Sequence, residues 1–508
     1  MMRLERILAA CIALGWVLAT SHSARAADTP ELTMLFPPGG QVGTSVDVLA
    51  QGKFPVWPVK TWTDSPHVQW SCQDETGKLR VEIAPDAELG LHWLRLYESN
   101  GATALRPYLI GSSHEASEAE PNDRASQAQS VDQLPFTIQG VLNRRADVDL
   151  YAVQLTTGQV LAAAVDSAKW LSSPADISLQ ILDAQGFVLT ENLDHVGLDP
   201  YIDFTAPRAG KYLVRLFGFP SAPDSTIAFS GGSDWVYRLQ LGIVSAPLSS
   251  ALDFSRQAEL TEPASQLEPG AHTTLSQALP VDVPVRVAGI IAEARQANFV
   301  RFSARNGAHY HFSVLARDCG SQLDATLAVL DADGKQLTRI DDVGQVRDPQ
   351  LAWQAPADGQ FVVSISDFHN QGGEHFAYFL QLEERTADFS ANIASDLITT
   401  SVGKEIEIPI NVVRELDYQG PIQVSIEDLP SSVSCAAVES THGTDTAAKV
   451  TLKLTALEAF QGPLRIVVSS AVDTAGSTNP SEATLNATPR QHRVDTGDHK
   501  PMWLSITP

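Results

Sequence analysis

The chain has 508 residues and a formal net charge of −25. Such an acidic surface repels nucleic acid and anionic lipid, and the sequence has no cluster of basic and aromatic residues, so nucleic-acid binding is excluded as a function class. With 44% hydrophobic and 19% charged residues, the chain can bury several cores, and its length predicts about three to four domains.

Residues 1–26 have the pattern of a signal peptide. Arg3 and Arg6 precede an apolar run, and Ala24-Arg-Ala26 is typical of a cleavage site. The apolar run is too short to span a bilayer, and no later segment is apolar enough. We therefore expect an exported chain without a membrane span, located in the periplasm, at the cell surface or outside the cell.

The chain beyond this segment contains Cys72, Cys319 and Cys435. They fall in three different predicted domains, so no intradomain disulfide is expected. An exported chain without a disulfide framework must rely on its cores, with bound metal as a further option.

Residues 30–111 are predicted to form a first β-sandwich. The segments 44–48 and 79–83 alternate apolar and polar residues, as a strand with one buried face requires. The turn-rich start Phe36-Pro-Pro-Gly-Gly40, followed by Gly43-Thr-Ser-Val-Asp-Val48, resembles bacterial immunoglobulin-like domains.

An internal repeat organises the middle of the chain, with one copy at 118–245 and another at 267–385. Two glycines and an aspartate of the first copy, Gly140, Asp199 and Gly210, recur in the second at an offset of 149, as Gly289, Asp348 and Gly359. A period near 150 residues is too long for a solenoid and indicates tandem domains. The sequence therefore predicts two copies of one all-β module.

Residues 387–488 are predicted to form a fourth sandwich of immunoglobulin type, because segments such as 405–412 and 450–454 alternate cleanly. Residues 489–508 are predicted to be a loosely held C-terminal tail, in which Trp503–Ile506 adds an edge strand. The expected fold class is all-β, a multi-domain chain of β-sandwiches that presents its modules in a row.

The first repeat copy resembles the bacterial pre-peptidase C-terminal domain. The resemblance is carried by Glu120-Pro-Asn-Asp123, Gly140, Asp147-Val-Asp-Leu-Tyr151, Asp176-Ile-Ser-Leu179 and Ala209-Gly-Lys-Tyr-Leu-Val214. It implies a jelly-roll-like sandwich that is usually a non-catalytic module of secreted peptidases or surface proteins. The whole layout resembles exported proteins of planctomycete-type bacteria.

The same resemblance implies a calcium site. Calcium prefers about six to eight hard oxygen ligands, and an acidic extended segment facing an acidic loop would supply them. Without a cation, clustered carboxylates would repel one another. The alternative is a solvated acidic linker with a turn. The residues predicted as ligands are Glu118, Glu120, Asn122, Asp123, Asp147 and Asp149.

The second copy departs from this pattern. It opens with Glu262-Pro-Ala-Ser265, which lacks the Asn-Asp pair, and Gln296 and Asn298 replace Asp147 and Asp149. No calcium site is expected there.

No catalytic residue is predicted, and the protein is predicted not to be an enzyme. The sequence has no G-x-S-x-G motif, and His114-Glu-Ala-Ser-Glu118 has glutamate where a zinc protease needs its second histidine. His309 and His311 share one face of a strand and could meet His369 and His375 at a transition metal, although surface or packing roles are more common for such residues.

A long loop from Phe217 to Tyr237 contains several aromatic residues. Long loops on rigid sandwiches often carry binding sites. The favoured alternative is that Phe219, Trp235 and Tyr237 cap the core.

Together these features predict an exported, non-catalytic protein for binding or adhesion, or a scaffold of the cell envelope. The expected partner is an extracellular glycan or a matrix protein. The main alternative is an accessory or substrate-targeting subunit of a secreted peptidase or other hydrolase. A third hypothesis is an unrecognised hydrolase that uses an acid such as Asp367.

Overall fold

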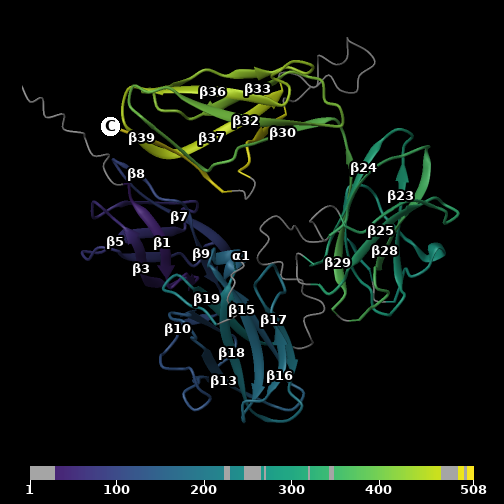
Figure 1. Ribbon diagram of the computed structural model, residues 1–508. Helices are drawn as coiled ribbons and strands as arrows, with labels where there is room; N and C mark the ends of the chain where they lie inside the picture. The colour runs from purple at the N-terminus through teal and green to yellow at the C-terminus, as the bar shows by residue number, and fades with distance from the viewer. Residues whose placement is uncertain are drawn as a thin grey trace, which may run out of the picture.

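The computed structural model describes residues 29–221, 229–244, 265–267, 270–317, 321–342, 348–373, 375–470, 490–496 and 500–508. The predicted signal peptide, the region 245–264 and Cys319 lie outside the described residues. The described part is almost entirely β, and its eight sheets form four two-sheet sandwiches (Figure 1). The predicted all-β, multi-domain fold class is confirmed.

The first sandwich follows the predicted period of two. In β6 (Lys78–Ile83), Leu79, Val81 and Ile83 are buried while the residues between them face solvent. One sheet has the order β1 (Glu31–Phe36), β3 (Ser45–Lys53), β6, β5 (Val68–Cys72). The other has the order β2 (Gly39–Gln41), β9 (Arg106–Gly111), β7 (Gly90–Glu98), β4 (Lys60–Thr63), with β8 (Gly101–Ala102) on β7.

The first repeat copy, here called module 1, has two five-stranded sheets. One has the order β10 (His114–Ser117), β12 (Phe136–Val141), β19 (Val236–Val244), β14 (Val160–Asp166), β17 (Tyr201–Thr205). The other has the order β11 (Gln129–Val131), β13 (Asp149–Leu155), β18 (Gly210–Pro220), β15 (Ala175–Asp183), β16 (Val188–Asn192), and the short helix α1 (Ala168–Leu171) follows β14.

The second copy, module 2, repeats this topology strand for strand. Its sheets have the orders β20 (Ser265–Gln266), β22 (Val285–Ile290), β29 (Ala377–Arg385), β24 (His309–Leu315), β27 (Gln350–Gln354), and β21 (Leu279–Pro280), β23 (Ala297–Ala304), β28 (Gly359–Asp367), β25 (Ala325–Leu330), β26 (Gln336–Ile340). A 3-10 turn (Leu275–Gln277) precedes β21. The sequence repeat is therefore a repeat of structure.

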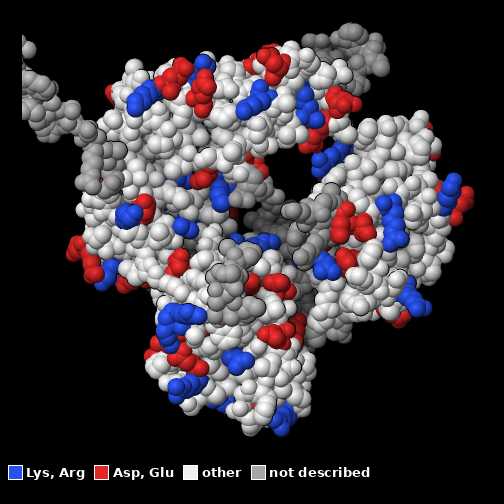
Figure 2. Space-filling view, viewed as in Figure 1, with Lys and Arg blue, Asp and Glu red and all other residues white. Residues whose placement is uncertain are grey.

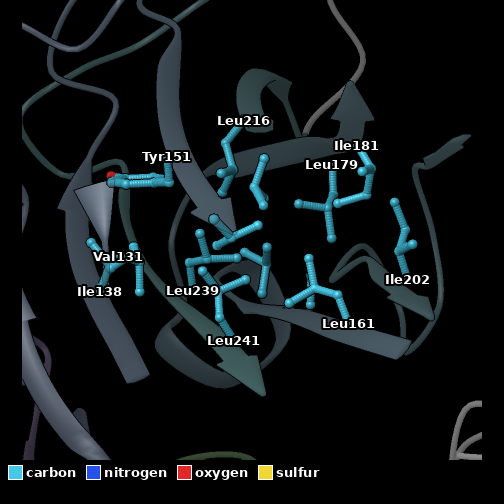
Figure 3. Packing of buried hydrophobic residues seen from close by; sticks show 14 of the residues in the cluster. Val131, Ile138, Tyr151, Leu161, Leu179, Ile181, Ile202, Leu216, Leu239 and Leu241 are labelled. Carbon is cyan, nitrogen blue, oxygen red and sulfur yellow. The ribbon is translucent and has the colours of Figure 1, made fainter. Parts of the chain in front are cut away.

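The core of module 1 lies between its two sheets. Leu179 and Leu216 from one sheet point toward Leu161 and Leu239 from the other, and all four are fully buried (Figure 3). Burial of a leucine side chain stabilises a fold by about 1.5–3 kcal/mol, so this contact between sheets holds the module rigid.

The fourth sandwich differs from the prediction at its C-terminus. Its sheets have the orders β30 (Asp388–Asn392), β32 (Ile406–Glu415), β36 (Lys449–Ala456), β34 (Val433–Cys435), and β31 (Leu397–Ser401), β39 (Met502–Thr507), β37 (Phe460–Ser470), β33 (Ile422–Glu427), β35 (Val438–Ser440), with β38 (Gln491–Arg493) on β37.

The strand around Trp503 is therefore interior, not an edge strand in a loose tail. β39 pairs in parallel with β31 on one side and antiparallel with β37 on the other. Trp503, Leu504 and Ile506 are buried. Because both faces of the strand pack, the last residues complete the fourth sandwich.

The first and fourth sandwiches contact each other, which corrects the prediction of modules in a row (Figure 1). The guanidinium of Arg95, fully buried on β7, forms an ion pair with Asp396. The ring of Trp503 packs 5.7 Å from Trp62 and 5.0 Å from Tyr97, measured between ring centroids. The N-terminal and C-terminal units thus lie side by side.

Figure 2 shows acidic and basic side chains interspersed over the visible face, without a large basic patch there. This distribution agrees with the excess of acidic residues, 60 against 35 lysines and arginines. Among the described residues, no helix has the length and hydropathy that a membrane crossing requires.

Candidate metal centre

Two segments of module 1 meet at the end of its β-sandwich. Residues 118–123 follow β10, and Asp147 and Asp149 stand at the start of β13. The amide of Glu118 donates to the carbonyl of Gln139 at 2.9 Å, and the amide of Leu150 donates to the carbonyl of Asn122 at 3.1 Å. These main-chain bonds hold the acidic segment and the acidic loop side by side.

Three of the predicted ligands converge. Glu120, Asp147 and Asp149 each offer a carboxylate oxygen, and these oxygens lie within 4.8 Å of one another. Asp147 and Asp149 are fully buried. Three carboxylates at this spacing can share one cation, and without a cation their charges repel.

A fourth predicted ligand, Asn122, is fully buried beside them. Its side-chain amide has one atom 3.2 Å from Oε2 of Glu120 and 3.0 Å from Oδ1 of Asp149. If this atom is nitrogen, it donates to both carboxylates; if it is oxygen, it can accept a hydrogen bond from a protonated carboxyl or bind a cation together with them. Either way, the amide contributes to the polar group that the carboxylates form.

Arg144 supplies the positive charge next to the cluster. Its guanidinium donates to Oδ1 of Asp123 at 2.6 Å and lies 3.6 Å from Glu120. It also lies 3.1 Å from Oδ1 of Asp147, a buried atom that accepts no hydrogen bond among the described residues. Asp123 is thus occupied by Arg144, outside the three-carboxylate group.

Glu118 lies behind the cluster, not in it. Its Oε1 accepts the amide of Val141 at 2.8 Å, and its Oε2 accepts the hydroxyl of Tyr237 at 3.1 Å. The same hydroxyl lies 2.6 Å from Oδ2 of Asp149. Glu118 therefore links the acidic segment to a tyrosine of β19 and, through it, to Asp149.

Burial strongly perturbs these acids. It raises the pKa of Asp149 to about 9, and the charge of Glu118 adds to that effect. Burial likewise raises the pKa of Glu118 to about 7, with a further contribution from the charge of Glu120. Loss of hydration destabilises the charged forms, so the unliganded cluster favours bound protons.

Gly140 makes this arrangement possible. A Cβ at this position would clash with the ring and hydroxyl of Tyr237 and would lie 2.6 Å from Oε2 of Glu118. Its equivalent in module 2, Gly289, stands against Tyr378 in the same way, at 2.6 Å. The glycine of the repeat motif is therefore required because a tyrosine packs directly on the backbone.

Module 2 has the same pocket with neutral side chains. Nδ2 of Asn298 donates to the carbonyl of Ile290 at 2.8 Å and to Tyr378 at 3.1 Å. Nε2 of Gln296 donates to Oδ1 of Asn298 at 2.8 Å. The amides hydrogen-bond one another without a cation, whereas ionised carboxylates only accept and cannot hydrogen-bond one another.

The alternative catalytic and zinc residues do not form a site in the described part of the chain. Asp367 is buried and accepts the amides of Asp324 at 3.1 Å and Gln371 at 2.8 Å, so it holds a loop in place. His311 lies beside Glu383, while His369 lies 3.2 Å from Asp324. The one group with metal-ligand spacing among the described residues is the acidic cluster of module 1.

The aromatic residues of the loop from Phe217 to Tyr237 fall into two groups, one buried in the core and one partly exposed. Trp235 and Tyr237 belong to the core of module 1, while Phe219 is half-buried and Phe229 is 40% exposed. Residues 222–228 lie outside the described residues. Tyr237 also has a polar role, in its bonds to Glu118 and Asp149, that the expected core-capping role does not include; the recurrence of this tyrosine as Tyr378 in module 2 is the signal for it in the sequence.

No protein-family model and no curated protein matches the sequence. Among solved structures, the chain is similar in part to the pre-peptidase C-terminal domain of a collagenase from Bacillus anthracis. The identity is 13%, the TM-score is 0.18, and the match covers 21% of this chain and 94% of that chain.

A periplasmic inhibitor of g-type lysozyme from Aeromonas hydrophila, PliG, matches with 14% identity and a TM-score of 0.17, over 23% of this chain and 97% of that chain. Domains 1–6 of the surface layer protein SbsC match with 9% identity and a TM-score of 0.15, over 95% of this chain and 55% of that chain. Scores this low assign no function, so the family resemblance stays a prediction from the motifs.

Proposed function

We propose that this protein is an exported, non-catalytic binding or adhesion protein, or a scaffold of the cell envelope, whose module 1 is stabilised by calcium. The observation that supports it best is the convergence of Glu120, Asp147 and Asp149 around the buried Asn122. The partner, whether an extracellular glycan, a matrix protein or a secreted hydrolase, stays a prediction from the sequence.

The donor set fits calcium. Every candidate ligand offers oxygen, which suits a hard divalent cation, and none offers the nitrogen or sulfur that zinc prefers. Glu120, Asp147, Asp149 and Asn122 would hold the ion. A bound cation supplies positive charge that offsets the repulsion between the carboxylates. It would thereby fix residues 118–123, which follow β10 at the start of module 1.

The proposal predicts that the effect of Asp147→Asn on the stability of the protein depends on whether calcium is present. In chelator, the variant should be close to the parent protein in stability, because the loss of one repelling charge offsets the loss of the ion pair with Arg144 and an oxygen still accepts the amide of Asn143. With calcium at about 100 times its Kd, the parent should gain about 2.7 kcal/mol and the variant much less.

The measurement is a thermal melt of the full chain in chelator and in calcium. Asp132→Asn, an exposed acid in the same module, is the matched control and should keep the full gain. If Asp147→Asn and the parent respond equally to calcium, the cluster is a solvated acidic linker.

The response to calcium should also depend on pH. The pKa values of Asp149 and Glu118 are raised in the folded, cation-free protein, so their protonated forms contribute stability that is lost as the pH rises from about 4 toward 9. Calcium needs the ionised forms. Melts in chelator and in calcium should therefore differ more at pH 8 than at pH 5; an equal difference would mean that the buried acids take no part in binding.

A further inference from the structure

A cavity of about 460 Å³ lies between the first sandwich and module 1. Its apolar walls include Met34 and Leu35 from the first sandwich and Leu171 and Val236 from module 1. This volume is within the range of small-molecule sites, which often lie between domains and combine apolar walls with a few polar groups.

The two walls are held in a fixed relation. Buried Arg238 of β19, which forms an ion pair with Glu115 of β10, packs against Gly39 of the first sandwich, where an added Cβ would lie 2.7 Å from its Nε. Nε2 of Gln139 in module 1 donates to the carbonyl of Gly39 in the first sandwich at 3.0 Å. The cavity is therefore formed in advance, which lowers the entropic cost of binding.

One wall carries a cation with unused donors. Arg106 lies half-buried on β9, and its Nε donates to the carbonyl of Leu32 at 2.9 Å. Its two terminal nitrogens form no hydrogen bond or ion pair within the described ranges. Burial lowers the pKa of this guanidinium. An anion in the cavity would restore the interactions that burial has removed.

The other wall carries an anion. Asp234 precedes β19, lines the same cavity and is exposed. It forms no hydrogen bond or ion pair in the part of the chain that the structure describes, although its charge acts on Arg106. The two opposite charges come from different units and face the same space.

We propose that this cavity binds a small zwitterion with an apolar side chain, of the size of an amino acid such as leucine. The carboxylate of the ligand would accept hydrogen bonds from Arg106, and its ammonium group would lie toward Asp234. Its alkyl group would pack against Met34, Leu171 and Val236. A purely anionic ligand fits less well, because Asp234 and the net charge of −25 would repel it.

Titration calorimetry of the full chain tests this with three probes: leucine, 4-methylpentanoate, which lacks the ammonium group, and 3-methylbutylamine, which lacks the carboxylate. Leucine should bind with a Kd of about 1 mM or tighter, and each analogue should bind at least about tenfold more weakly. Arg106→Gln and Asp234→Asn should each weaken leucine binding by a similar factor. Arg80→Gln, on the other sheet of the first sandwich, should leave it unchanged.

The proposal would be overturned if leucine did not bind at about 10 mM. It would also be overturned if all three probes bound equally well, or if both variants bound leucine as tightly as the parent protein. Asp234 is exposed and accepts no hydrogen bond within the described ranges, so Asp234→Asn keeps the test decisive even if Arg106→Gln fails to fold.

Discussion

Replacing Gly140 by alanine is expected to destabilise module 1 by about 3 kcal/mol or more and to abolish its response to calcium. The added Cβ would occupy the space of the Tyr237 ring and would approach Glu118 to 2.6 Å. The ring cannot retreat, because Tyr237 is fully buried in the core between the two sheets. Its hydroxyl would also lose its bonds to Asp149 and Glu118.

Two other glycines provide controls for this prediction. Gly242→Ala, in the same strand as Tyr237, should be tolerated because no atom lies within 4 Å of the new Cβ. Gly289→Ala should damage module 2 through Tyr378 and leave calcium binding intact. Calorimetry and calcium titration of the three variants separate these outcomes. Calcium binding that survives Gly140→Ala would show that the tyrosine does not support the cluster.

Replacing Asp396 by asparagine is expected to reduce the free energy that holds the first and fourth sandwiches together by about 2–4 kcal/mol. Arg95 has no exposed surface, and Asp396 is the partner of its charge. Its remaining bond, to the carbonyl of Thr103 at 2.7 Å, does not neutralise it. A buried guanidinium without its anion pays the full cost of lost hydration.

Hydrogen exchange measures this effect locally. Protection should fall by about 30-fold or more in β7 and β39, and the double variant Arg95→Met/Asp396→Leu should recover part of it. The exposed pair Arg80–Asp47 is the matched control, since solvent screens its charges and Asp47→Asn should leave protection nearly unchanged. Unchanged protection in Asp396→Asn would mean that the aromatic contacts of Trp503 hold the sandwiches together alone.

The fold was largely predictable from local pattern. Alternation such as that of residues 78–83 defines strands with one buried face, and the spacing of Gly140 and Gly289 defines a repeat. Contacts between distant strands were not predictable in the same way. The interior position of Trp503 depends on pairing with β31 and β37, which no local periodicity specifies.

The candidate site shows the same division. Glu120, Asp147 and Asp149 stood out because acidic residues cluster in the sequence and resemble a family motif. The roles of Arg144 and Tyr237 depend on how the chain folds back, as does the capture of Asp123 by Arg144. Asp367 was a candidate acid for the hydrolase hypothesis, but its carboxylate accepts hydrogen bonds from backbone amides of the surrounding loops, which the sequence does not reveal.

Calcium stoichiometry tests the central claim most directly. Titration calorimetry of the chelator-treated full chain should give one calcium ion per chain. That binding should disappear in the variant Glu120→Gln/Asp147→Asn and persist in Asp132→Asn. Absence of binding at about 1 mM calcium, or binding that the double variant retains, would contradict a metal centre in module 1.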